Sequence, residues 1–204
     1  EQVTAGLLAI CLQEQGVPAR SWLGWQIPIR TSDAHARARI EGIEIEEMER
    51  RFSDGQVCVL AGFQGIGPDN RITTLGRGGS DTTAVALAAA LKADRCDIYT
   101  DVDGVYTSDP RIVTRARKLS KVTYEEMLEM ASLGAKVLQT RSVELAMNHR
   151  VPVQVLSSFD EAVGSERPGT LVVDEEDIVE HEIVSGVTYS RDEAKITLVQ
   201  VSDR

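Results

Sequence analysis

The chain has 204 residues, a formal net charge of −10 at pH 7, and a composition that is 42% hydrophobic, 26% charged and 4% aromatic. This length fits one large domain, or one domain with part of another, and the hydrophobic content excludes wholesale disorder. The acidic balance argues against a general binder of nucleic acids or anionic membranes, because both need clustered positive charge. No apolar run is long enough to cross a bilayer, and residues 1–15 lack the basic start and cleavage site of a signal peptide.

The cysteines and histidines do not form a metal-binding pattern. Three cysteines stand far apart in apolar runs, which predicts reduced core residues of a cytoplasmic protein: Cys11, Cys58 and Cys96. The histidines also lie far apart, without the spacing of metal ligands: His35, His149 and His181. We therefore expect no metal site built from these side chains.

The first part of the chain mixes one long helix with short strands. Residues 2–15 place apolar side chains at helical spacing, and Gly16 ends the run. Residues 57–63 are almost entirely apolar and rich in β-branched side chains, which is typical of a strand covered on both faces. The other predicted elements are a strand at 19–24, a hairpin at 34–45 around Gly42, a charged helix at 44–51, a loop at 64–71 and a strand at 72–75.

The second part alternates strands with helices as far as residue 156. After a glycine loop at 76–81, we predict helices at 82–92, 124–133 and 140–148, strands at 97–100, 151–156 and 170–173, and a polar loop at 101–111. Alternation of this kind indicates an α/β fold with a mostly parallel sheet and helices on both sides. The acidic stretch 174–177 is predicted to be a linker. The strand-like segments 182–188 and 195–201 would then begin a separate small domain.

The strongest local motif is Gly-Arg-Gly-Gly-Ser-Asp-Thr-Thr at residues 76–83, which leads into a helix. Its glycines allow the backbone to approach a ligand closely, and the helix start offers free N–H groups to an anion. Arg77 is suited to bidentate binding of a carboxylate or phosphate, and Ser80 or Asp81 can cap the helix. The alternative is a plain glycine turn with an Asp cap and a solvated Arg. The pattern is neither a P-loop nor a dinucleotide fingerprint.

Two further segments carry candidate residues. The loop at 100–111 follows a predicted strand, where α/β sheets bind ligands, and its aspartates, tyrosine and arginine suit a nucleotide. The alternative is a turn-rich surface loop punctuated by Pro110. Lys136, in Gly-Ala-Lys-Val-Leu, would neutralise phosphate charge if it faced the nucleotide, although a lone lysine is usually solvated.

Four strings together resemble the aspartate kinases of the amino-acid-kinase family: residues 73–84, 97–111, 130–138 and 151–158. The resemblance extends over residues 1–173. It implies a three-layer αβα fold (carbamate kinase-like) with an eight-stranded, largely parallel sheet. It also implies ATP with Mg²⁺ and L-aspartate as substrates, and 4-phospho-L-aspartate as the product.

The resemblance also assigns residues to roles. Arg77 would hold a substrate carboxylate, and Asp81 and Glu1 would meet the substrate ammonium. The remaining substrate-binding positions implied are Gly78, Gly79 and Ser80. Lys136 would reach the nucleotide phosphates, and it joins Arg77 and Asp81 as the implied catalytic set. The other ATP-binding positions implied are Thr100, Asp101, Tyr106, Thr107, Ser108, Asp109, Pro110 and Arg111.

The chain departs from the family pattern at both ends. It lacks the Lys-Phe/Tyr-Gly-Gly-Thr-Ser motif with which these enzymes open, and it carries only an ACT-like start of the regulatory region within 174–204. We therefore expect a fragment that is inactive alone. The resemblance implies lysine or threonine as effectors and a homo-oligomer or a catalytic and regulatory subunit assembly. The alternatives are a glutamate 5-kinase or acetylglutamate kinase type of enzyme, or a non-catalytic subunit.

Overall fold

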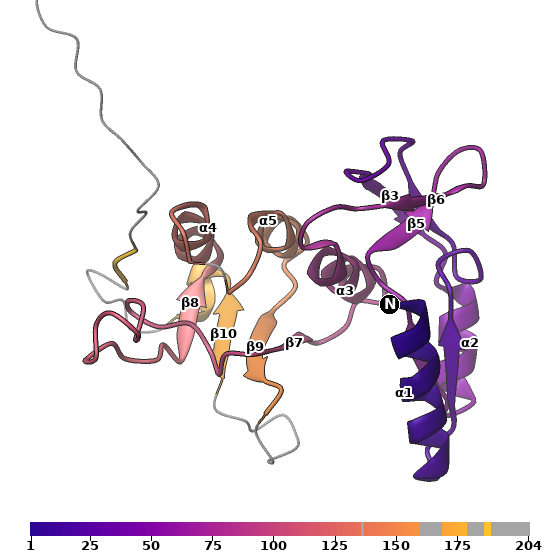
Figure 1. Cartoon of the computed structure of the whole chain (residues 1–204), viewed down its shortest axis with the longest axis horizontal. Coiled ribbons are helices and arrows are strands. Elements are labelled where there is room, and N and C mark those ends of the chain that lie inside the picture. The colour runs from indigo at the N-terminus through magenta and orange to yellow at the C-terminus, as the bar shows by residue number, and fades with distance from the viewer. Residues whose placement is uncertain (136, 160–168, 179–185, 189–204) are drawn as a thin grey trace, which may run out of the picture.

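The computed structural model describes residues 1–135, 137–159, 169–178 and 186–188, and these form an α/β fold (Figure 1). The elements of the first part are α1 (Gln2–Glu14), β1 (Ala19–Trp22), β2 (Ile29–Thr31), β3 (Ile40–Ile43), α2 (Glu46–Ser53), β4 (Val57–Leu60), β5 (Gln64–Ile66) and β6 (Ile72–Thr74). Those of the second part are α3 (Gly79–Ala90), β7 (Cys96–Thr100), β8 (Lys121–Thr123), α4 (Tyr124–Ser132), α5 (Thr140–His149), β9 (Val153–Ser157), β10 (Thr170–Val173) and a 3₁₀ turn at Glu175–Asp177.

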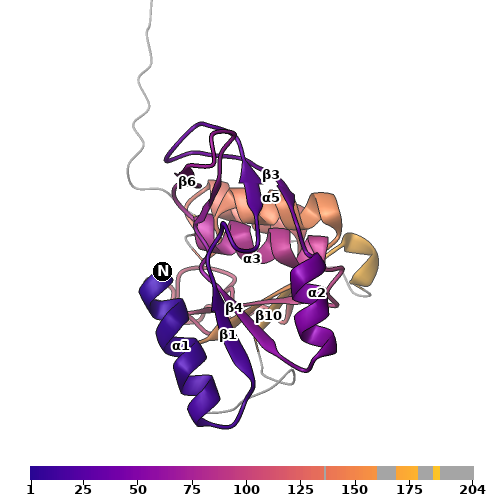
Figure 2. The same cartoon turned by 90° about the vertical axis from the view of Figure 1, so that its right-hand side faces the viewer.

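A parallel pair of strands, β1 and β4, lies between two helices. Figure 2 shows α1 on one side of this pair and α2 on the other, so three layers are formed locally. Ala5 and Ala9 are the buried residues of α1. On the opposite side, Trp22, Ile27 and Met48 form a small core. Leu87 of α3 and its C-cap residue Leu91 pack against this core. Because α3 contributes to this core, the first part of the chain is tied to the second.

The main sheet has the strand order β7-β9-β10-β8, and α3, α5 and α4 cover one of its faces (Figure 1). Alternate strand residues, among them Ile98, Val155 and Val172, point into the core beneath these helices. Residues of the opposite parity, including Asp97 and Lys121, line a groove of about 720 Å³. The period of two in strands therefore places core residues on one face and groove-lining residues on the other, although β9 is buried along its whole length.

Four of the seven pairings among the described strands are parallel, which confirms the α/β class with a mostly parallel sheet. The described strands divide among three hydrogen-bonded sheets instead of the single eight-stranded sheet that the resemblance implies. The third sheet, with the order β3-β2-β5-β6, is mostly antiparallel.

The sequence-based expectations were wrong in detail for this third sheet. The hairpin joins β2 to β3, and Gly42 lies within β3 opposite Arg30 instead of at the turn. The predicted loop at 64–71 begins with strand β5. This strand was not predicted because its middle residue, Gly65, has no side chain and glycine alone indicates a loop. A Cβ at Gly65 would clash with Thr31, so glycine is required there by close strand approach.

Other boundaries and burial predictions also need correction. Helix α3 starts at Gly79, three residues before the predicted start, and β8 was not expected. Strand β4 is only partly buried, because its first residue, Val57, is exposed. Of the cysteines predicted for the core, only Cys96 is buried, whereas Cys11 is exposed and Cys58 is intermediate; all three are free thiols.

No described helix has the length and apolar character needed to span a membrane. The strands predicted at 182–188 and 195–201 lie outside the described residues, apart from 186–188. The division into a catalytic domain at 1–173 and an ACT-like start at 174–204 therefore stays a prediction.

Gly65→Ala should destabilise the fold by about 1–3 kcal/mol, because overpacking of a close contact forces the neighbouring backbone to shift. Gly42→Ala, on strand β3 of the same sheet, is the matched control, since a Cβ there meets nothing within 4 Å. The free energy of unfolding from urea titrations measures both. Equal stability of the two variants would contradict this account of β5.

Candidate functional site

The start of α3 is reached through a loop that turns twice through positive φ. Gly76 has φ +83° and Gly78, the N-cap residue, has φ +70°. Side chains are excluded at both places, because a Cβ on Gly76 would clash with the carbonyl oxygen of Ala36, and one on Gly78 would clash with the side chain of Gln139. The glycines of the motif are thus required by conformation and by close packing.

Ser80 and Asp81 lie in the first turn of α3 and neither caps the helix, so the capping prediction was wrong. Gly78 holds the N-cap position, where its carbonyl oxygen accepts a hydrogen bond from the hydroxyl of Thr82 at 2.9 Å. Gly78 is favoured because the αL backbone at the cap disfavours a Cβ. The side chains of Ser80 and Asp81 are consequently left for other partners.

Glu1, the first residue of the chain, contacts this turn. Its Oε1 accepts a hydrogen bond of 2.7 Å from the hydroxyl of Ser80, although the two residues lie 79 positions apart. Burial, and next to it the charge of Glu1, raises the pKa of Asp81 above its ordinary 3.8. Two carboxylates therefore share one small region, and among the described residues no cation forms an ion pair with either of them.

Arg77 projects from the turn as an exposed side chain. Within the described part of the chain its guanidinium makes no hydrogen bond or ion pair, so it is available to an anion. Arg141 of α5, which sequence reasoning missed, donates to the carbonyl oxygens of Leu75 at 2.9 Å and Ala38 at 2.7 Å. This second arginine holds the backbone just before the exposed one.

The polar loop after β7 is anchored by one buried hydroxyl. Thr170 is fully buried, and its Oγ1 accepts from the backbone N–H of Val105 at 2.8 Å and donates to the carbonyl oxygen of Leu119 at 2.6 Å. Gly104, with φ +151°, packs so tightly that a Cβ would lie 2.7 Å from this hydroxyl. The turn between strand and loop is therefore closely specified, although Thr170 was not among the predicted site residues.

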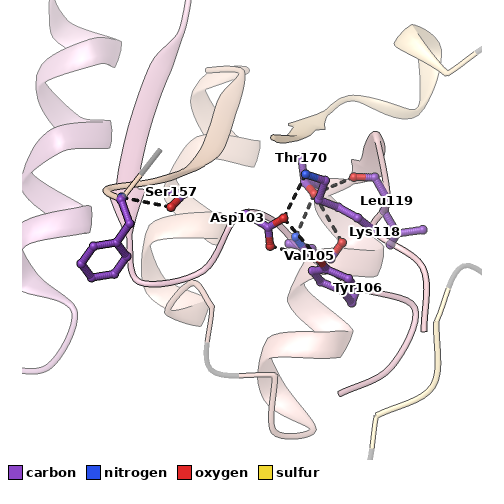
Figure 3. Close-up of polar contacts among 8 residues, drawn as sticks. Asp103, Val105, Tyr106, Lys118, Leu119, Ser157 and Thr170 are labelled. Atoms are coloured by element: carbon purple, nitrogen blue, oxygen red, sulfur yellow. Dashed lines mark hydrogen bonds and ion pairs between the residues drawn. The ribbon is translucent and has the colours of Figure 1, made fainter. Parts of the chain in front are cut away.

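Asp103, Tyr106 and Lys118 form a polar cluster within this loop (Figure 3). The hydroxyl of Tyr106 donates to the Asp103 carboxylate at 3.1 Å, and Nζ of Lys118 lies 3.1 Å from it. Burial raises the pKa of Asp103, but the hydrogen bonds from Lys118 and Tyr106 outweigh it and hold the pKa below its ordinary value. Burial and the bond to Asp103 raise the pKa of Tyr106. Only Tyr106 of this cluster was predicted.

The remaining predicted nucleotide residues are arranged around the same loop. The Thr100 hydroxyl donates to Asp101 at 3.2 Å, and Arg111 pairs with Asp109 through two contacts of 3.2 Å. The carbonyl oxygen of Thr107 accepts from the N–H of Val187 at 2.7 Å. Two further predicted positions also belong to this loop: Ser108, half-buried, and Pro110, exposed.

The fold brings the two motifs to one end of α3 and β7. These elements pack together, and the chain reverses between them at residues 91–95, so the start of α3 lies at the same end as the end of β7. Parallel strand β9 ends there too, where Ser158 donates to the carbonyl oxygen of Thr100 at 2.8 Å. The groove on the open sheet face contains none of the predicted site residues.

Lys136, the third predicted catalytic residue, lies outside the described residues. The described part of the chain holds no group of three or more His, Cys, Asp or Glu side chains arranged for a metal ion. Asp101 and Asp109 are nevertheless oxygen donors of the kind that Mg²⁺ takes, and Mg²⁺ bound with a nucleotide needs only one or two protein carboxylates.

The sequence profile of the Amino acid kinase family matches residues 1–157. The chain is 57% identical over 204 residues to an aspartate kinase of Stutzerimonas stutzeri (strain A1501), a match that covers 100% of this chain and 48% of the relative. The chain thus spans about half the length of the curated relatives that it matches.

Two solved structures of E. coli aspartokinase III are also similar. The complex with aspartate and ADP (R-state) has a TM-score of 0.75 at 38% identity, covering 84% of this chain and 38% of the other. The complex with lysine and aspartate (T-state) has a TM-score of 0.72 at 37% identity, covering 85% and 39%. Because the family profile matches residues 1–157, which is more than half of the chain, the chain belongs to the amino acid kinase family.

Proposed function

We propose that this chain is part of an aspartate kinase, an ATP-dependent phosphotransferase that converts L-aspartate to 4-phospho-L-aspartate in amino-acid biosynthesis leading to lysine, threonine and methionine. The observation that carries the proposal is the set of charged side chains at the turn before α3. The turn carries the exposed guanidinium of Arg77, and the first turn of the helix that follows carries Asp81 and Ser80, the latter hydrogen-bonded to Glu1. Neither carboxylate, that of Asp81 or that of Glu1, has a cation partner among the described residues.

Aspartate has the complementary charges. One of its carboxylates would pair with Arg77, and its ammonium would lie against Asp81 and Glu1, with the hydroxyl of Ser80 and the backbone of Gly78 and Gly79 lining the turn. The raised pKa of Asp81 supports this assignment, because a carboxylate destabilised by burial and a like charge gains most from an incoming cation. The same turn would leave the second substrate carboxylate directed towards the nucleotide.

The loop after β7 would hold the nucleotide. Thr100, Asp101 and Tyr106 would contact the nucleoside, while Asp109, Arg111 and the neighbouring Thr107, Ser108 and Pro110 would shape the phosphate end. Mg²⁺ would neutralise phosphate charge, and Lys136 would reach the same phosphates. A carboxylate is already an adequate nucleophile, so phosphoryl transfer here needs positioning and charge neutralisation more than a general base.

The proposal extends to the setting of the enzyme. Residues 1–173 would form the catalytic region and 174–204 the linker and first strands of an ACT-like module that responds to lysine or threonine. The lysine complex of the E. coli neighbour supports lysine as an effector. We further propose a cytoplasmic enzyme that works as a homo-oligomer or a catalytic and regulatory subunit assembly, without nucleic-acid or membrane partners.

The full-length protein that carries this sequence tests the function directly. It should release ADP from MgATP in the presence of L-aspartate, and much more slowly with glutamate, acetylglutamate or UMP. Phosphorylation of glutamate or acetylglutamate instead would identify another enzyme of the same fold. Absence of turnover with every substrate would favour a non-catalytic subunit.

Arg77→Ala should raise the aspartate KM by about 10–100-fold, because a charged hydrogen bond contributes about 1.5–3 kcal/mol. The ATP KM should stay near the wild-type value. Arg71→Ala removes another exposed arginine, from the loop between β5 and β6, and serves as the control. An unchanged aspartate KM in the Arg77 variant would remove the carboxylate role of Arg77.

Asp81→Asn should weaken aspartate binding about tenfold, because a charged partner of the ammonium is lost. The same change should stabilise the fold at pH 7. The raised pKa means that the folded state binds the proton of Asp81 more tightly than the unfolded state does. Ionised Asp81 therefore lowers the stability of the wild-type fold at pH values above the ordinary pKa of 3.8. The stability difference between the variant and the wild type should vanish as the pH falls through that value. Urea unfolding against pH measures this, with exposed Asp69→Asn as the control; a destabilised Asp81 variant at pH 7 would be the contrary result.

Lys136→Ala should lower kcat by about 100-fold or more while changing the aspartate KM little, because it removes a cation from the developing phosphate charge. Lys92→Ala, an exposed lysine after α3, is the control and should retain full turnover. Steady-state kinetics with both substrates varied separates the two parameters. A normal kcat in the Lys136 variant would end its assignment to the phosphates.

A further inference from the structure

Arg141 connects three segments that are remote in sequence. It is the second residue of α5, and its guanidinium donates from Nη1 to the Leu75 carbonyl oxygen at 2.9 Å and from Nη2 to the Ala38 carbonyl oxygen at 2.7 Å. Leu75 is 2% exposed and Ala38 is fully buried. Both acceptors belong to buried residues, and a planar guanidinium is suited to hold two of them in a fixed relation.

The segments that Arg141 joins are also in close contact with one another. Ala36 adopts φ +69°, a left-handed conformation that is costly for a residue with a Cβ, and its N–H donates to the Thr74 hydroxyl at 3.1 Å. Ala38 donates through its N–H to the Thr74 carbonyl oxygen at 3.1 Å. The loop before β3 is therefore held against the strand that leads into the glycine turn.

The glycine turn lies between this loop and the start of α5. On one side the Ala36 carbonyl oxygen packs against Gly76, and on the other the side chain of Gln139, the N-cap residue of α5, packs against Gly78. Arg141 follows Gln139 by two residues and binds the backbone immediately before Gly76. The residue between the two glycines is Arg77, so the backbone on both sides of Arg77 is fixed by the α5 start.

Arg77 itself has no such support from its side chain. It is exposed, and within the described residues it makes no hydrogen bond or ion pair. The backbone of the turn therefore fixes the position of the Arg77 Cα and the direction of its Cα–Cβ bond, and so limits the region that the guanidinium can reach. A loose turn would spread Arg77 over many orientations, and binding would then cost the entropy of selecting one of them.

We propose that Arg141 is a positioning residue for Arg77: by holding the Leu75 and Ala38 carbonyls together, it orients the exposed guanidinium and so sets the affinity for the substrate carboxylate. The proposal rests on the function proposed above. Arg141 does not touch the substrate, and its effect reaches the substrate only through the glycine turn.

The test uses the full-length protein with Arg141→Met, Arg141→Lys and, as a control, Arg150→Met. Arg150 is the C-cap residue at the other end of α5, where it is exposed and, among the described residues, pairs with Asp174 at 3.8 Å, so its loss removes the same charge from the end of the same helix. Arg141→Met should raise the aspartate KM about tenfold, since two charge-assisted hydrogen bonds are lost, and leave the ATP KM within about twofold. Arg141→Lys, which can serve one carbonyl at a time, should raise the aspartate KM by about threefold.

A second readout does not depend on turnover. Amide hydrogen exchange of peptides covering residues 75–81 should accelerate in Arg141→Met and stay unchanged in Arg150→Met. Failure of the wild-type protein to phosphorylate aspartate would defeat the proposed function, while this exchange experiment would still test the hold on the turn.

Three results would overturn the positioning role. The first is an unchanged aspartate KM in Arg141→Met, whatever the exchange shows. The second is an equal rise of the aspartate and ATP KM values, which would indicate general damage to the fold. The third is an Arg141→Lys variant with wild-type kinetics and exchange; this variant alone decides the question if Arg141→Met does not fold.

Discussion

The backbone between Leu75 and Gly79 must reverse direction and still deliver a helix start to the surface, and the candidate site depends on that turn being held. Gly76 and Gly78 have left-handed backbone angles, which make the reversal sterically allowed. Steric freedom alone does not hold the turn in one conformation. Neighbouring residues fix this backbone. The Ala36 carbonyl oxygen packs on Gly76 and the Gln139 side chain packs on Gly78. The Arg141 guanidinium binds the carbonyl oxygen of Leu75, just before the two glycines. The exposed side chains of the turn are thus positioned by residues outside the turn.

The two loops of the site are secured in different ways. The glycine turn is held from several directions by separate segments, whereas the loop after β7 is held at its base by one fully buried hydroxyl, that of Thr170. Further along, the second loop depends on exposed or half-exposed pairs such as Arg111 with Asp109, which contribute little to stability in water. The first loop is therefore held more firmly along its length than the second.

Much of the fold could be predicted because helical periodicity and buried strands are local properties. The helices α1, α4 and α5 and the strands β7, β9 and β10 were placed to within a few residues. Strand β5 was missed because Gly65 is there for close strand approach, and glycine in isolation indicates a loop. The start of α3 was placed late for the same reason, since glycine at a helix start carries little local signal.

The site could be predicted only where its residues stand together in the sequence. The glycine motif and the loop after β7 were recognised as strings, and the fold brings them to the same end of α3 and β7. Arg141 was not predicted because its acceptors are backbone carbonyls 66 and 103 positions away. Every residue has a backbone carbonyl, so the sequence does not mark those that accept a hydrogen bond. Thr170 and Lys118 act through similar long-range contacts. Supporting residues of this kind become visible only when the chain is folded.

The closeness of Glu1 and Asp81 has a consequence for the heat of ligand binding. Because the pKa of Asp81 is raised above its ordinary 3.8, the folded protein keeps a proton on this carboxyl to a higher pH than an unperturbed Asp would. An entering cation lowers that pKa again and expels the proton into the buffer. Association would then release hydrogen ions, and its apparent enthalpy would vary with the ionisation heat of the buffer chosen, an effect that disappears in alkaline solution where the carboxylates are already bare.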